Sequence, residues 1–141
     1  MQLALVIARI DTQMPTLKQV TAAASVPLAI AALKTYPSAC VVMPRGNAGK
    51  NSLTNALSQR VEDSFAVILA VKNVQDMQGK AAAAEMDTLR LGLNAALLGW
   101  TFDAAYEPIE YAGYQLIAYQ DGLLFWADHF LTRHYERAIG V

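Results

Sequence analysis

The polar segment from Gly46 to Ser52, Gly-Asn-Ala-Gly-Lys-Asn-Ser, is the stretch whose residue types come closest to a phosphate-binding loop. A nucleotide-binding P-loop has four residues between its first glycine and the Gly-Lys pair, with serine or threonine directly after the lysine. Here two residues intervene and Asn51 follows Lys50. The segment also leads into a strand pattern and not into a helix whose N-terminus would hold a phosphate. The spacing therefore argues against nucleotide binding and predicts a loop that becomes ordered against a partner.

Histidine, cysteine and carboxylate residues do not form a catalytic or metal-binding set. His129 and His134 fall in one strand pattern, where residues five positions apart point to opposite faces, and Asp128 beside His129 also points away from it. Cys40 lies in an apolar run and adds no third ligand at the usual spacing. As the single cysteine it can form no internal disulfide, and we expect a buried, inert thiol. The sequence predicts no cofactor or metal and a protein that is not an enzyme.

Composition narrows the class of partners. The chain has 141 residues, a formal net charge of −1 and no basic tract, so it lacks the charge pattern of a nucleic-acid-binding protein. Aromatic side chains near the C-terminus could stack on bases, but such platforms lie in positively charged grooves. Charged residues make up only 16%, which favours buried subunit contacts. No apolar stretch reaches the roughly 18 residues of a membrane span, and no secretion signal is evident, so we expect a cytosolic protein.

The first half of the chain predicts two helices and two strands. Apolar residues at helical spacing indicate a helix over residues 2–12. A strand over 17–24 is followed by a second helix, which Ser25 can cap and which ends near Tyr36. Residues 39–43 form the next strand, which we expect Pro44 to end.

The second half begins with a polar loop over residues 45–54 and a long strand over 61–72. The clearest helix spans about 76–98, with a buried stripe and a wet stripe. The buried stripe comprises Met86, Leu89, Leu93, Leu97 and Trp100, and the wet one Asp76, Lys80, Asp87, Arg90 and Asn94. A connection over 107–113, which contains Pro108, leads to the last element.

Residues 114–135 predict a β-hairpin that is apolar on both faces. Asp121-Gly122 suits a two-residue type I′ turn, which would place Tyr119 opposite Leu124, Ala118 opposite Phe125 and Ile117 opposite Trp126. One face then carries Leu116, Ala118, Leu123, Phe125, Ala127 and Leu131, and the other Ile117, Tyr119, Leu124, Trp126 and Phe130. An antiparallel sheet usually has one dry and one wet face. We therefore expect another copy of the chain to cover the second face.

These elements give the order αβαββαββ in a single domain over residues 1–141. The expected fold class is α+β, with a mainly antiparallel mixed sheet of four to five strands and helices packed on one face.

The sequence resembles the tail terminator (tail completion) proteins of long-tailed bacteriophages and prophages. The resemblance rests on Ser38-Ala-Cys-Val-Val-Met-Pro44, Phe65-Ala-Val-Ile-Leu-Ala-Val71, Glu107-Pro-Ile-Glu-Tyr-Ala-Gly113 and the segment from Asp121 to Tyr135. It implies a non-enzymatic, cofactor-free subunit of a ring, commonly a hexamer, on the head-proximal end of the tail tube. Such a ring stops tube polymerisation and provides the head-joining surface. The implied partners are the tail tube protein and a head-completion or connector protein, first in the host cytoplasm and then in the virion tail.

Two groups of residues are candidates for contacts in such a ring. A ring closes when two different patches of one subunit meet, and large aromatic side chains often anchor such contacts. We expect Trp126 and Phe130 to be the anchors. The loop candidates for the tube or the neighbouring subunit are Arg45, Asn47, Lys50 and Asn51, and the hairpin candidates are Ile117, Tyr119, Trp126 and Phe130.

Two other functions are compatible with the sequence. Another tail-completion or head–tail joining protein could have a similar small α/β subunit. A small-ligand-binding or enzymatic α+β dimer, with its pocket between subunits, belongs to a different class. A six-fold particle would favour the ring, and a dimer with a closed polar pocket would favour the enzyme.

Overall fold

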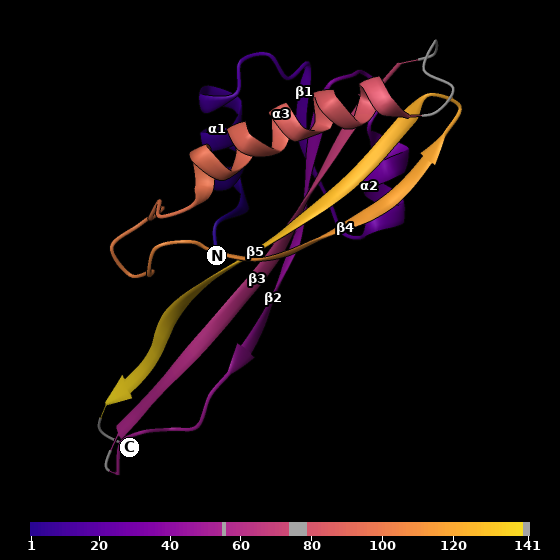
Figure 1. Ribbon diagram of the computed structural model, residues 1–141. Helices are drawn as coiled ribbons and strands as arrows, with labels where there is room; N and C mark the ends of the chain where they lie inside the picture. The colour runs from indigo at the N-terminus through magenta and orange to yellow at the C-terminus, as the bar shows by residue number, and fades with distance from the viewer. Residues whose placement is uncertain (55, 74–78, 140–141) are drawn as a thin grey trace.

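The computed structural model describes residues 1–54, 56–73 and 79–139, which form three helices and five strands (Figure 1). In chain order these are α1 (Leu3–Gln13), β1 (Gln19–Ala23), α2 (Val26–Ala32), β2 (Ser38–Ala48), β3 (Ala56–Lys72), α3 (Lys80–Leu97), β4 (Glu110–Gln120) and β5 (Leu123–Ile139). The order αβαββαββ and the α+β class are therefore confirmed.

The five strands form one mixed sheet in the order β1-β2-β3-β5-β4. Only β1 and β2 run parallel, and the other three pairings are antiparallel. The longest pairing joins β3 to β5 without a register shift, from Ala56 opposite Ile139 to Lys72 opposite Leu123. This ribbon is the centre of the sheet: β2 pairs with β3 on one edge, β4 pairs with β5 on the other, and β1 pairs with β2.

Helices cover both faces of the sheet. Val6 and Ile10 of α1 pack with the buried stripe of α3 against Val41 and Val67, whereas Leu33 beside α2 packs on the opposite face. The expectation of helices on one face is therefore wrong for α2. The reason lies in β3, where every residue from Phe65 to Val71 is buried, as in strands covered on both sides.

The hairpin turn has the predicted geometry, but beyond Ala118 the strand pairing differs from the prediction by one residue. Asp121 and Gly122 both have positive φ, 54° and 78°, as a type I′ turn requires. The pairs Tyr119–Leu124 and Ala118–Phe125 are confirmed, whereas Leu116, and not Ile117, lies opposite Trp126. A register shift between Leu116 and Ala118 places Ile117 outside the ladder, so Leu116 joins the face of Trp126.

The subunit's own helices cover the apolar face that was expected to need a second copy. Phe130 is fully buried and stacks on Phe65 with 5.5 Å between ring centroids. Leu124 is buried in the same cluster, and Trp126 packs against it. The expectation failed because α1 and α3 share this face, whereas α2 covers part of the other.

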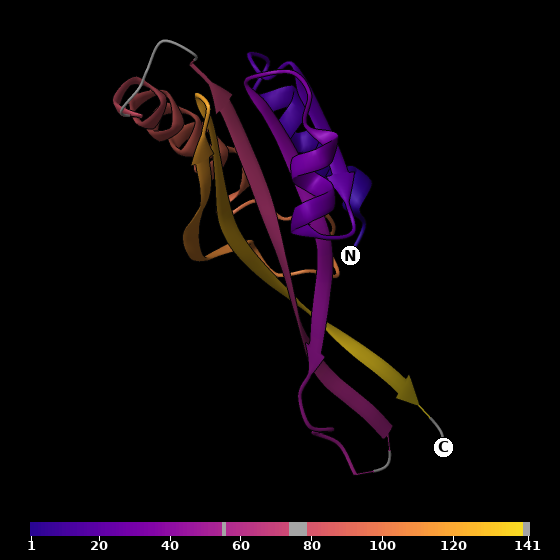
Figure 2. The same cartoon turned by 90° about the vertical axis from the view of Figure 1, so that its right-hand side faces the viewer.

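Beyond the helices, β2, β3 and β5 continue as an arm, defined here as residues 45–48, 56–63 and 132–139 (Figures 1 and 2). The prediction that Pro44 ends the second strand is wrong. A register shift between Val42 and Arg45 takes the proline out of the ladder, and the strand then resumes to Ala48.

The remaining boundaries agree within five residues, and the largest difference is at β3, which begins at Ala56 and not at residue 61. Ser25 caps α2 by accepting a hydrogen bond from the Leu28 N–H, and Gly99, with a φ of 77°, follows the end of α3. The predicted start of the third helix at residues 76–78 lies outside the described residues, and the described helix begins at Lys80. β4 begins at Glu110, inside the expected connection.

Cys40 is fully buried on the face of α2, where burial raises the pKa of its thiol to about 11 from a reference of 9.0. The unfolded chain loses this proton at lower pH, so the contribution to stability is present below about pH 9 and is lost as pH rises toward 11. We expect the free energy of unfolding to fall about 1–3 kcal/mol more over this range in the native chain than in Cys40→Ala. Urea titrations at several pH values measure the difference. Parallel pH profiles of the two proteins would contradict it.

Candidate assembly surfaces

The loop candidates lie at the arm, where they play different structural roles. Arg45 and Asn47 belong to the extension of β2, and Lys50 follows it; all three are exposed. Asn51 organises the turn, because its amide nitrogen donates to the carbonyls of Leu53 and Ala56 at 2.9 and 3.1 Å. Its amide oxygen also accepts from the backbone N–H groups of Leu53 and Ser58. The expected loop is therefore half strand and half an asparagine-stabilised turn.

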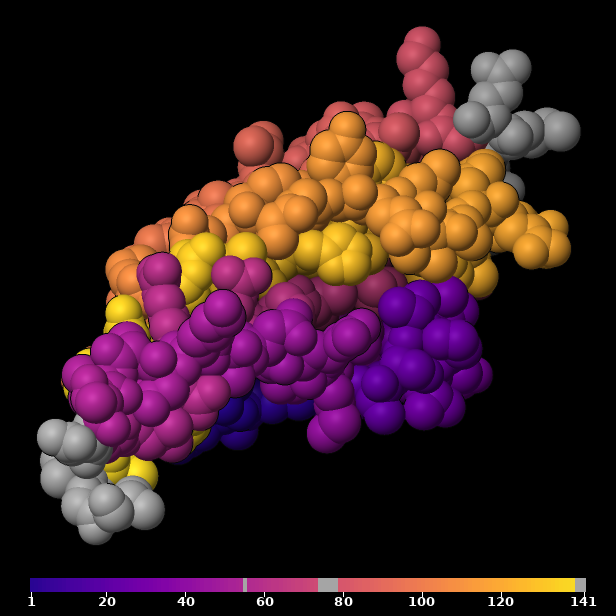
Figure 3. All heavy atoms as spheres, turned by 90° about the horizontal axis from the view of Figure 1, so that it is seen from below, coloured from indigo at the N-terminus to yellow at the C-terminus, as the bar shows by residue number. Residues whose placement is uncertain are grey.

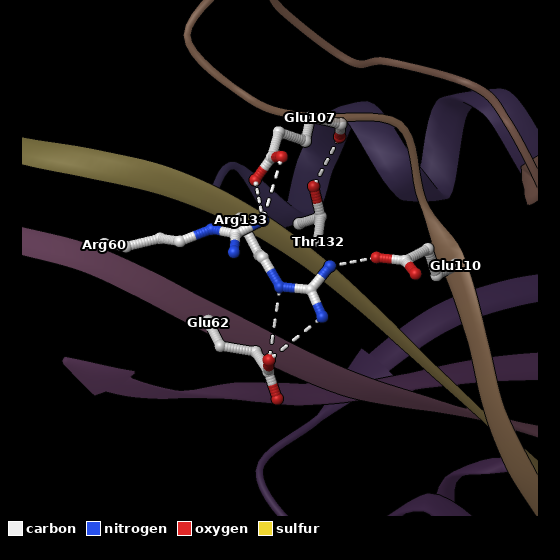
Figure 4. A network of polar contacts seen from close by, with 6 residues as sticks. All are labelled: Arg60, Glu62, Glu107, Glu110, Thr132 and Arg133. Carbon is white, nitrogen blue, oxygen red and sulfur yellow. Dashed lines mark hydrogen bonds and ion pairs between the residues drawn. The ribbon is translucent and has the colours of Figure 1, made fainter. Parts of the chain in front are cut away.

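A polar network holds the root of the arm against the connection before β4 (Figure 4). Arg133 on β5 donates from Nε to Glu62 on β3 at 3.2 Å and pairs with Glu110 at the start of β4. The hydrogen bond with Glu110 is the main cause that raises the pKa of the Arg133 guanidinium. This one side chain therefore links three strands where the arm leaves the body.

Glu107 completes the network from the connection. Its carboxylate accepts two hydrogen bonds from Arg60 Nη2, at 3.0 and 3.1 Å, and its backbone carbonyl accepts from the hydroxyl of the buried Thr132 at 2.6 Å. The Glu107 N–H donates in turn to the Arg133 carbonyl at 2.8 Å. The combination of side-chain and backbone bonds fixes the direction of the arm relative to the body.

The two histidines lie on different faces, as the strand pattern predicts. His134 lies between carboxylates, with Nδ1 2.6 Å from Asp63 and Nε2 2.8 Å from Glu136, and its ring contacts that of Tyr106. His129 lines a surface groove on the face of α2. Among the described residues, no three histidine, cysteine or acidic side chains are placed to hold a metal ion. None of the described helices is long and apolar enough to cross a membrane.

A buried ion pair joins α3 to the hairpin, and sequence reasoning missed it. Asp128 is fully buried, and both of its carboxylate oxygens accept hydrogen bonds from Arg90, at 3.0 to 3.3 Å. The Tyr111 hydroxyl donates to the same carboxylate at 2.7 Å. The hydrogen bond with Asp128 is the main cause that raises the pKa of Arg90. An aspartate on an otherwise apolar strand face was the available signal for a buried cationic partner.

The same arginine packs on two aromatic rings. Its guanidinium carbon lies 4.7 Å from the centroid of Tyr114 and 4.5 Å from that of Trp126. The two rings stack at 5.4 Å with an interplanar angle of 19°. Trp126 is consequently half-buried against its own chain. A substitution at Trp126 would therefore disturb the subunit itself and would not isolate a contact between subunits.

The other hairpin candidates are also engaged within the subunit. Phe130 is fully buried, so its side chain is not accessible to a neighbouring subunit in this conformation. Ile117 packs partly on the cluster beside α2, and Tyr119 packs partly on the cluster beneath α3. The apolar side chains that the hairpin does expose are on β4: Tyr111, Tyr114 and Leu116, with exposed fractions of 38%, 62% and 53%.

A groove with a volume of about 400 Å³ opens on the face of α2. Its lining is mainly apolar, with Arg45, Ser64 and His129 as its polar members; the apolar residues are Val26, Val42, Met43, Phe65 and Ala66. Figure 3 shows the hollow between α2 and β4, with β3 and β5 beneath it. Val42, Ala66 and His129 lie in one row across the sheet, because Val42 pairs with Ala66 and Ala66 with His129.

The ion pair yields a stability prediction. Asp128→Asn removes the charge that compensates Arg90, and we expect it to lower the free energy of unfolding by about 3 kcal/mol, because a buried charge loses its partner. Asp11→Asn, an exposed change on α1, is the matched control and should change stability by less than about 0.5 kcal/mol. Chemical denaturation followed by tryptophan fluorescence measures both. Equal stability of the two variants would show that the pair contributes little.

The similarity to a known protein family extends over nearly the whole chain. The family model described as "Phage tail terminator protein" matches residues 1–140. No individual curated protein matches the sequence significantly. The matched family consists of structural assembly proteins of the phage tail. The resemblance expected from the sequence segments is thus confirmed over essentially the full length, and the chain belongs to the phage tail terminator family.

Proposed function

We propose that this protein forms a ring that caps the head-proximal end of the phage tail tube. In this family the ring is commonly a hexamer. The ring stops tube polymerisation and provides the surface that joins the head. The observation that carries the proposal is the match of residues 1–140 to the tail terminator family, which supports a role in phage tail assembly. The proposed partners are further copies of the chain, the tail tube protein and a head-completion or connector protein. Assembly takes place in the host cytoplasm, and the finished ring stays at the head-proximal end of the virion tail.

The arm is the part of the subunit that we assign to the tail tube. The arm extends beyond all three helices (Figure 2). Arg45 and Asn47 in its β2 strand are exposed, and so is Lys50 just after that strand. Ion pairs at its root connect it to the body through Arg60 and Arg133. A contact at the tip is therefore transmitted to a fixed base, and little conformational freedom has to be lost when the arm binds.

Tube length measures the proposed activity directly. Tail tube subunits of the same phage, mixed with increasing amounts of the protein while they polymerise, should give progressively shorter tubes in electron micrographs, with a ring at one end. The double variant Asn47→Ala/Lys50→Ala should need roughly tenfold more protein for the same effect, a loss of about 1.4 kcal/mol. Gln13→Ala/Lys18→Ala removes an exposed amide and an exposed positive charge from the body and is the matched control.

Tubes of unchanged length at a molar excess of folded protein would contradict the capping function. If the arm variant capped as well as the native chain, capping would stand and the contact would have to lie elsewhere on the subunit.

A further inference from the structure

Exposed apolar side chains gather on the edge strand of the sheet and on the adjoining helix. We define the β4 patch as Leu91 of α3 with Tyr111, Tyr114 and Leu116 of β4. Their exposed fractions run from 38% for Tyr111 to 73% for Leu91. Arg90 connects them, because it bonds to the Tyr111 hydroxyl, packs on the Tyr114 ring and precedes Leu91. Tyrosine and arginine, together with tryptophan, are the residue types enriched among those that dominate binding energies.

The charge at the centre of the β4 patch is already neutralised. Asp128 pairs with Arg90 through both oxygens and is itself fully buried. A partner that covers this patch therefore leaves no uncompensated charge behind, which would otherwise oppose binding. The unpaired charge beside the patch is that of Asp87, one helical turn before Arg90 and Leu91; it is exposed, and no partner is found for it among the described residues.

The groove on the face of α2 has the complementary character. Its volume of about 400 Å³ lies within the range of pockets that bury a small molecule, about 300–1,000 Å³, so the groove has room for one or two side chains. Its floor is apolar, and Met43 at its edge is 55% exposed. Arg45 gives it a positive charge, and no acidic partner is found for this side chain among the described residues.

One molecule cannot bring these two surfaces together. Tyr114 and Leu116 pair with Asp128 and Trp126 on the face that α3 covers, whereas the groove floor lies on the opposite face, with Cys40 and Ile68. Two different, complementary patches on one chain are what a head-to-tail contact requires, and repetition of such a contact with the right rotation closes a ring. Both surfaces are largely apolar. Asp87, beside the β4 patch, is opposite in charge to Arg45, which lines the groove.

We propose that the β4 patch of one subunit docks into the α2 groove of a second copy of this chain, with Tyr114 and Leu116 against the groove and Asp87 facing Arg45. The proposal rests on the ring proposed above and names the two surfaces that build it. The anchors of this contact are the exposed side chains of Tyr114 and Leu116, in place of Trp126 and Phe130.

A mixing experiment tests the contact. Leu116→Asp disables the patch, and Met43→Asp disables the groove; both side chains are more than half exposed, so either chain should fold. In light scattering after gel filtration, each variant alone should be a monomer of about 15.3 kDa, whereas the native chain forms the ring. An equimolar mixture should give a dimer and nothing larger, because one intact patch meets one intact groove. Leu53→Asp, an exposed leucine outside both surfaces, should leave the ring intact.

A charge exchange provides a second test that does not touch the apolar side chains. Arg45→Glu should weaken self-association about tenfold, and Asp87→Arg in the same chain should restore it. Circular dichroism checks that each variant is folded.

Several results would overturn the contact: a native chain that stays monomeric at high concentration, a ring formed by either aspartate variant, or a mixture that stays monomeric. The tube assay separates this failure from failure of the function. Variants that still cap tubes while the predicted contact is absent would refute the docking surfaces and leave the proposed function standing.

Discussion

The uninterrupted pairing of β3 with β5 is the constraint on which the rest of the structure depends. The two strands stay in register from Lys72 and Leu123 at the top of the body to Ala56 and Ile139 in the arm. In the body both faces of this ribbon are apolar, and both are covered by helices. The same two strands then extend past the helices, so the body and the arm cannot move independently without breaking backbone hydrogen bonds.

The two parts of the ribbon are held by different forces. In the body, burial of apolar side chains dominates, and Asp128 is tolerated only because Arg90 and Tyr111 satisfy it. At the root of the arm, hydrogen bonds and ion pairs hold the strands instead, and Arg133 and Thr132 bond to residues of other segments. Polar fixation leaves the arm free to present exposed side chains, which a helical cover would bury. The membership of the chain in the tail terminator family agrees with a subunit built for contacts with other proteins.

Local signals predicted the element order and the hairpin turn. Asp121-Gly122 and Ser25 act through their immediate neighbours, so sequence alone reveals them. The bulge at Ile117 and the continuation of β2 beyond Pro44 depend on partner strands and could not be read in the same way. Alternating apolar residues showed that the hairpin needs two covers but not which elements supply them. That missing information led to a second copy being expected where α3 lies.

The candidate surfaces were predictable only in part. The exposure of Arg45 and Lys50 is expected from their charged side chains, and both are exposed in the structure. Large aromatic side chains suit a core as well as an interface, so the sequence could not show that Phe130 is fully buried and Trp126 half-buried within the subunit itself. The β4 patch became visible only once the sheet order placed β4 at an edge and the register placed Leu116 beside Trp126.

Amide hydrogen exchange on the isolated subunit tests most directly whether one ribbon carries both the body and the arm. Peptides from residues 56–62 of β3 should be protected, though less than those from 65–71, because exchange in the arm requires opening the β3–β5 ladder but little of the core. Exchange of the arm peptides at the rate of an unstructured chain, with the body still protected, would contradict a continuous ribbon.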